Sequence, residues 1–274
     1  MTAYLVATRH GLVELSKNRL AAVILLCLIP VVITLAYVVV TDEALVFRHR
    51  TMDVQITAWG NETSTISVAV NLVSQLVGFA MFAAAHRAGE FDRRLVGAGY
   101  PRLALIAAKL TTLALTAAVV SGYATVWVGW YWQVQQPPLL WLGLFLSGVV
   151  YGSMGLFLAL FLPGELEGLF VIILATVIDM VLQNPIINPT ADSGTIALLP
   201  GYGGTQLGLA AGFTDSMPTS AIAVSALWAA VLSAIAFGAF CLRTRNRLST
   251  ARHNRLLATA PGDATVGDRG DSAG

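Results

Sequence analysis

The chain has 274 residues, of which 56% are apolar and 11% are charged, and its formal net charge is +1. Its mean hydropathy of +0.73 lies outside the range of soluble globular domains, because so few polar groups cannot cover the apolar surface in water. This excludes an ordinary soluble domain and predicts a lipid environment. Cys27 and Cys241 both lie in apolar runs, so they do not indicate a redox compartment.

Residues 1–19 are predicted to form an amphipathic helix that lies in the membrane interface. On a helical wheel one half of the segment is apolar and the other is polar, which is typical of interfacial helices. The apolar half holds Tyr4, Leu5, Val6, Leu12, Val13 and Leu15. A short solvated leader that continues into the first membrane span is the alternative.

Residues 20–242 are predicted to form an all-α membrane domain. A helix needs about 20 apolar residues to cross the hydrocarbon core, and six stretches meet this requirement. Helices are expected because the runs are continuous and because backbone groups in lipid must be bonded within the segment. The predicted spans are 20–40, 65–85, 110–132, 139–162, 166–183 and 220–242, and residues 41–64 are expected to be an outer loop.

The cationic residues predict that both termini are cytoplasmic. With this orientation all of the 16 lysines and arginines except Arg48 and Arg50 lie inside, which agrees with the positive-inside rule. The tail, residues 243–274, is predicted to be basic first and disordered afterwards. Arginine greatly outnumbers lysine, as in many bacterial proteins from GC-rich genomes, and the expected location is the bacterial plasma membrane.

Residues 86–102 gather an unusual number of charges between two apolar spans. Within this loop, residues 89–96 can form a short helix with Phe91 and Leu95 on one side. The charged residues Glu90, Asp92, Arg93 and Arg94 cover its other sides. The segment is therefore either a docking element for a soluble partner or a solvated loop whose arginines follow the positive-inside rule.

Polar side chains in the second span fall on one helix face. They are Ser67, Asn71, Ser74 and Gln75. Because unpaired amides are costly in lipid, this face should point into the bundle. Both a role in hydrogen bonding between helices and a role in lining a substrate path are open. In the fourth span, Gly148, Gly152 and Gly155 repeat at helical spacing and predict close helix packing.

Asp179 is the carboxylate deepest within a predicted span, with Gln183 on the same helix face. Intramembrane carboxylates are usually paired or functional, so Asp179 is a candidate for an outer gate. A hydrogen-bonding role near the helix end is the alternative. The following segment, 184–219, is rich in Gly and Pro yet apolar, which predicts short re-entrant helices at the outer end.

The sequence contains none of the usual catalytic or metal motifs. It has no H-E-x-x-H pattern and no G-x-x-x-x-G-K-[ST] loop, so neither a metalloprotease nor a nucleotide hydrolase is expected. We expect no catalytic residues, no metal site and no nucleic-acid partner.

The charged segment resembles the cytoplasmic loop of ABC-2 type transporter permeases. The matching positions are Arg87, Glu90, Arg93, Leu95, Pro101, Arg102 and Lys109. The resemblance implies a dimer with a second permease copy or paralogue and two separate ATPase subunits that bind ATP and Mg²⁺. It implies that Arg87–Leu95 dock on the ATPase and that an amphipathic or hydrophobic substrate, such as a drug, lipid or natural product, is exported.

Two rival functions remain open at this point. An ion-coupled secondary transporter needs several titratable groups at mid-membrane, and Asp179 alone is available in a span. The other rival is a membrane scaffold that transports nothing.

Overall fold

The computed structural model describes residues 3–17, 19–188 and 194–259. Most of this part of the chain is helical. The elements are α1 (Ala3–Lys17), α2 (Arg19–Val39), β1 (Ala44–His49), β2 (Val54–Trp59), α3 (Gly60–Gly97), α4 (Arg102–Tyr131), α5 (Pro137–Leu158), α6 (Glu165–Gln183), η1 (Gly194–Leu198), α7 (Tyr202–Phe213) and α8 (Thr219–Thr259).

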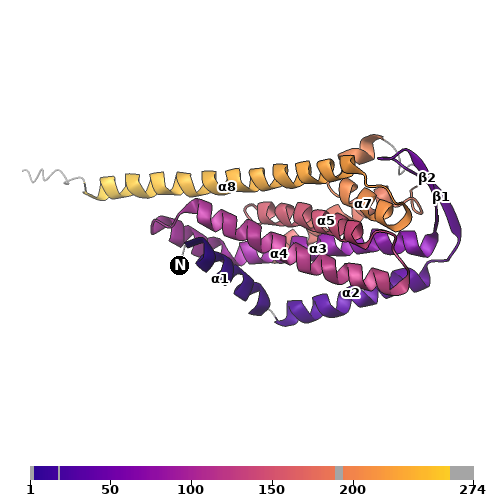
Figure 1. Ribbon diagram of the computed structural model, residues 1–274. Helices are drawn as coiled ribbons and strands as arrows, with labels where there is room; N and C mark the ends of the chain where they lie inside the picture. The colour runs from indigo at the N-terminus through magenta and orange to yellow at the C-terminus, as the bar shows by residue number, and fades with distance from the viewer. Residues whose placement is uncertain (1–2, 18, 189–193, 260–274) are drawn as a thin grey trace, which may run out of the picture.

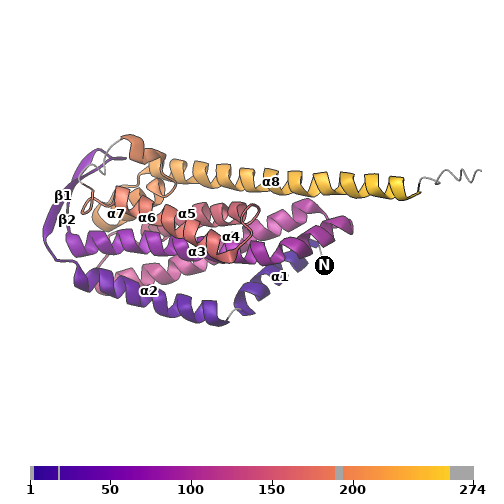
Figure 2. The ribbon, with the colours of Figure 1, turned by 180° about the vertical axis from the view of Figure 1, so that it is seen from behind.

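The long helices run back and forth along one axis and form an elongated bundle (Figures 1 and 2). The hairpin β1–β2 and α7 lie at one end, which we call the hairpin end. Helix α1, the turn from α3 to α4 and the final turns of α8 lie at the other, which we call the α1 end (Figure 1). Helix α3 is central, because it packs against α5 and also against α2, α4, α6 and α7.

The bundle is compatible with a membrane protein. Four helices in the described part of the chain are long and apolar enough to cross a bilayer: α3, α4, α5 and the first part of α8, Thr219–Cys241. The outer faces of the helices are also apolar, with Val119, Phe170 and Leu227 each more than 60% exposed. The predicted number of six spans is not confirmed: α6 is not among the four, and for α2 the apolar stretch within the described side chains is limited to Leu26–Val39.

The C-terminal end of the predicted layout needs one correction. Helix α8 continues through the basic stretch to Thr259, so residues 243–259 are helical and extend past the bundle (Figure 1). Disorder was predicted for residues 258–274, of which 258–259 are the last residues of α8 and 260–274 lie outside the described residues.

The predicted all-α class is wrong for residues 41–64, where the chain forms an antiparallel hairpin. Strand β1 pairs with β2 from Ala44 opposite Trp59 to His49 opposite Val54. Both strands contain β-branched and aromatic residues, which favour strands. The four-residue turn ends at Asp53, whose φ of 56° lies in the left-handed region that Asp tolerates, and the Asp53 carboxylate pairs with Arg48. A two-stranded hairpin alone is marginal in water, so packing on the bundle must support this one.

The prediction of a separate short helix between the second and third spans is also wrong. Helix α3 continues without interruption through residues 86–97, so the charged segment is the last part of that helix. The chain turns only at Gly97–Pro101, where Gly99 has a φ of 91° and Tyr100 N–H donates to Leu95 O at 3.0 Å. Gly89 alone does not end the helix, because helix-forming residues flank it on both sides.

Helix α1 packs on the bundle through its polar and small residues. The Tyr4 hydroxyl lies 2.8 Å from Thr111 Oγ1, and Gly11 approaches Thr112. Leu5 and Val6, from the predicted apolar half, are about half exposed. Exposed apolar side chains suit contact with lipid, although the interfacial position of α1 stays a prediction.

The glycines of α5 allow close contact with its neighbours, as their spacing predicted. A Cβ atom on Gly155 would lie 2.2 Å from the carbonyl oxygen of Gly78 in α3, and one on Gly152 would lie 2.2 Å from Leu113 Cδ1 in α4. No side chain fits at these distances. The backbones of α3 and α5 therefore approach closely because glycines lie at their contact, as in small-residue membrane interfaces.

We predict that Gly155→Ala destabilises the bundle, because the new methyl group meets backbone that can move only if α3 and α5 separate. Overpacking of this kind typically costs about 1–3 kcal/mol. The control is Gly129→Ala in α4, where a Cβ has open space within 4 Å and the higher helix propensity of alanine should leave stability unchanged or slightly raised. Thermal unfolding of the detergent-solubilised variants measures both, and equal melting temperatures would contradict the packing role.

Candidate functional site

The charged end of α3 divides into exposed and buried side chains. Glu90 and Arg94 are exposed, Phe91 is 52% exposed and Leu95 is partly buried. The Phe91 ring lies 5.9 Å from the His10 ring of α1, centroid to centroid. The side chain of Arg93 lies outside the described part of the structure. An apolar ring surrounded by charges is therefore presented at the α1 end.

Two side chains of the same segment connect α3 to its neighbours. Asp92 points inward and forms an ion pair of 2.7 Å with Lys109 of α4. Arg87 lies 3.9 Å from Glu165 at the start of α6, a contact that is exposed and therefore weak. Asp92 thus does not lie on the outer face with Glu90 and Phe91, although the sequence grouped them together.

Asp179 is the centre of a buried polar cluster near the hairpin end. Its carboxylate accepts hydrogen bonds from the Tyr151 hydroxyl of α5, from Gly201 N–H at 2.6 Å and from Gln183 Nε2 at 2.8 Å. Gly201 immediately precedes α7, so the carboxylate lies at the N-terminus of that helix, where the helix dipole favours negative charge. A single side chain therefore joins α5, α6 and α7.

The polar stripe of α3 joins the same region. Asn71 Nδ2 donates to Thr176 O of α6 at 2.7 Å, and Gln75 Nε2 donates to Asn71 Oδ1 at 2.9 Å. Ser74 donates to Val70 O within its own helix. Asn71, Ser74, Asp179 and Gln183 surround a cavity of about 10 Å³, which is about the minimum that holds one water molecule. In this conformation the predicted substrate path is closed, and its residues bond to each other.

Helix α7 fills the centre of the hairpin end. All residues from Tyr202 to Gly212 are buried, and at about 18 Å the helix is too short to cross a bilayer. The structure thus places two short helices, η1 and α7, in the segment predicted to be re-entrant, while their depth in a membrane stays a prediction. The Gln136 side chain holds the end of α7 by donating to Thr214 O at 2.6 Å.

His49 attaches the hairpin to α7. Its Nε2 lies 2.9 Å from Gln206 O, and because a carbonyl oxygen only accepts, Nε2 carries the proton. Burial lowers the pKa of His49 below its ordinary value, although the hydrogen bond to Gln206 partly opposes this. The neutral ring is therefore favoured in the folded protein, and the hairpin contact is most stable above the ordinary histidine pKa.

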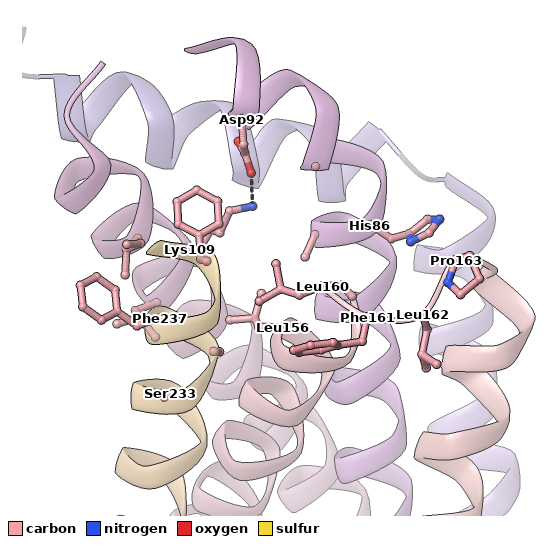
Figure 3. Close-up of a pocket in the computed structure, with 17 residues that line it drawn as sticks. His86, Asp92, Lys109, Leu156, Leu160, Phe161, Leu162, Pro163, Ser233 and Phe237 are labelled. Atoms are coloured by element: carbon pink, nitrogen blue, oxygen red, sulfur yellow. Dashed lines mark ion pairs between the residues drawn. The ribbon is translucent and has the colours of Figure 1, made fainter. Parts of the chain in front are cut away.

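A larger cavity, of about 270 Å³, lies at the α1 end between α3, α4, the end of α5 and α8. Figure 3 shows Asp92 and Lys109 pointing toward each other at one end of it, with Leu156, Leu160 and Phe237 along its walls. The His86 ring points away from this pair in Figure 3 and stacks on Phe82.

Sequence reasoning missed two parts of these sites. Tyr151 was not singled out, although a tyrosine in the middle of an apolar span needs a hydrogen-bond partner and so points to a buried acceptor. The cavity at the α1 end was not predicted, because its walls come from four helices that are distant in sequence.

In comparisons with known proteins, no family model matches this chain and no curated protein sequence matches it.

We predict that Tyr151→Phe and Asp179→Asn each lower the free energy of unfolding by about 1–3 kcal/mol, because each leaves a buried polar group without its partner. The double variant should cost clearly less than the sum of the two, because both changes remove the same interaction. Denaturant unfolding in detergent measures this cycle. Tyr123→Phe, which removes an exposed bond to Leu26 O, is the control, and strictly additive costs would show that the two groups act independently.

Proposed function

We propose that the chain is the permease subunit of an ATP-driven ABC-2 type exporter in the bacterial plasma membrane, with both termini cytoplasmic. The observation that carries the proposal is the exposed Phe91, flanked by Glu90 and Arg94, at the end of one uninterrupted 38-residue helix. A continuous helix of this length extends about 57 Å. Force applied at Phe91 therefore reaches the polar cluster at the far end without a hinge.

The internal contacts of the charged segment support the same mechanism. The Asp92–Lys109 pair connects the end of α3 to α4, and Arg87 and Glu165 place it beside α6. When a partner ATPase closes around Phe91 and Arg94, α3 and α4 move together, and the weak Arg87–Glu165 contact yields, so that α3 moves against α6. Asn71 then shifts relative to Thr176, and the closed polar cluster around Asp179 opens as an outer gate.

In the proposed complex the two kinds of subunit have different functions. The ATPase subunits bind ATP and Mg²⁺ and hydrolyse the nucleotide, whereas this chain performs no catalysis and provides the path. Two permease copies, or this chain and a paralogue, assemble in the lipid bilayer. The apolar, small-residue interior suits an amphipathic or hydrophobic substrate such as a drug, a lipid or a natural product.

The orientation is tested by cysteine accessibility in a background that carries Cys27→Ala and Cys241→Ala. We expect Glu90→Cys to react with a membrane-impermeant maleimide only after the cells are permeabilised. Gln55→Cys, on the exposed side of β2 at the opposite end, should react in intact cells. Labelling of residue 90 in intact cells would place the docking surface outside the cell and remove the proposal.

Docking is tested by photo-crosslinking. A benzoylphenylalanine at Phe91 should form an adduct with an ATPase chain that carries a nucleotide-binding loop, whereas the same probe at the exposed Trp130, on the last turn of α4 towards the hairpin end, should not. Arg94→Glu should lower the adduct yield and the ATPase activity of the complex about tenfold, which corresponds to about 1.4 kcal/mol of lost contact energy. Arg48→Glu is the matched charge reversal at the hairpin end, and equal effects of the two reversals would contradict docking at α3.

A further inference from the structure

Two cavities at the α1 end meet at the same ion pair. The first, of about 270 Å³, lies between α3, α4, α5 and α8, and the second, of about 340 Å³, lies between α1, α3 and α4. Both are close to the lower limit of small-molecule pockets. Ala85, Asp92, Lys109 and Leu156 line both cavities, so the Asp92–Lys109 pair lies at the boundary between them.

The lysine of this pair is available to a ligand. The Lys109 side chain is 26% exposed, whereas that of Asp92 is 9% exposed. An ammonium group has three N–H donors, and the described ion pair uses one carboxylate oxygen. An anion that enters the cavity can therefore bind Lys109 beside Asp92, or displace that carboxylate from it.

The rest of the first cavity is suited to an acyl chain. Its walls include the apolar side chains Leu156, Leu160 and Phe161, with Phe237 of α8 opposite (Figure 3). Phe237 is 37% exposed and Phe161 is 63% exposed, so the cavity opens onto the apolar outer surface of the bundle. The second cavity is lined in part by His10, Arg87 and Tyr100, and α1 contributes one of its walls.

The charged residues at the α1 end favour a ligand with a negative charge. Arg9, Arg87, Arg94 and Arg102 all lie at the α1 end, and Glu90, Glu165 and Glu167 only partly offset them. Basic segments close to a bilayer attract anionic lipids. A charged pair at the end of an apolar cavity, at an end of the bundle where these arginines outnumber these glutamates, fits an amphiphile with a negative headgroup.

We propose that the first cavity binds an anionic phospholipid, with the headgroup phosphate on Lys109 and an acyl chain along Leu156 and Phe237. Asp92 competes with the phosphate for Lys109 and so sets the affinity. This inference does not depend on the exporter proposal, since it concerns lipid binding by the isolated chain and needs no ATPase.

The test uses the full-length chain in detergent with equimolar phosphatidylglycerol and phosphatidylcholine, and native mass spectrometry counts the lipid that stays bound. The wild-type chain should prefer phosphatidylglycerol. Lys109→Gln should lose this preference, Lys109→Arg should keep it, and Asp92→Asn should increase it. Both Lys109→Gln and Asp92→Asn break the ion pair, so a purely structural role would change lipid binding in the same direction in both.

The position of the acyl chain is tested by filling each cavity separately. Ala159→Trp fills the first cavity and should abolish the preference for phosphatidylglycerol, whereas Ala7→Trp fills the second and should leave it unchanged. The proposal is overturned if Lys109→Gln keeps the preference, if Asp92→Asn lowers it, or if the two tryptophan variants act alike. Lys109→Arg and Ala7→Trp keep the ion pair intact, so they remain informative even if the other variants fold poorly.

Discussion

The continuity of α3 is the constraint on which the rest of the structure depends. The helix reaches from the hairpin, which ends at Trp59 one residue before it, to the turn at Gly97–Pro101. Its position is fixed where Gly78 meets Gly155 of α5, because these backbones approach too closely for any side chain. Since α3 is one uninterrupted helix, its charged end and Asn71, which joins the polar cluster, lie on the same element.

Helix α7 is held in a different way from the long helices. Gly203 and Gly204 lie against Ser225 and Ser147, so closely that a Cβ on either glycine would overlap a serine hydroxyl. Yet these two hydroxyls are among the described buried atoms that have no hydrogen-bond partner. Helix α7 is therefore held along its length by close packing. Its hydrogen bonds to the rest of the protein are made at its two ends and to His49 of the hairpin.

Two buried serine hydroxyls beside α7 thus have no partner among the described residues, although α7 is buried from Tyr202 to Gly212. Removing it breaks the Asp179–Gly201 and His49–Gln206 contacts but exposes two hydroxyls that are already unpaired. Unpaired buried hydroxyls are costly, and water or a polar substrate group would satisfy them. In the proposed exporter, movement of α3 against α6 acts on α7 through Asp179, which accepts a hydrogen bond from Gly201 N–H.

The helices of the bundle could be predicted well, because continuous apolar runs and the spacing of glycines depend only on residues close together in the sequence. The starts of α4, α5, α6 and α8 lie within eight residues of the predicted spans. The hairpin was missed because its two strands are short and depend on contact with α7. The extension of α3 was missed because charge was taken as the end of a helix, whereas the stop signal is the glycine and proline turn at 97–101.

The candidate sites were predicted in part for a similar reason. The polar face of α3 and the location of Asp179 follow from helical periodicity, and the structure brings Asn71 and Asp179 to one cavity. Periodicity does not say which residue on another helix is the partner. Tyr151 for Asp179 and Lys109 for Asp92 required the three-dimensional packing.

The Asp92–Lys109 pair is not explained by stability alone. Largely buried ion pairs often stabilise a fold no more than apolar residues of similar size, because desolvation offsets the attraction between the charges. In this place the pair instead connects the exposed Phe91 to the bundle. Asp92 follows Phe91 directly in α3, and Lys109 lies in the neighbouring helix α4. A phosphate that draws Lys109 away from Asp92 loosens the connection between α3 and α4. Lipid bound in the cavity would then set how firmly the docking surface is coupled to the bundle.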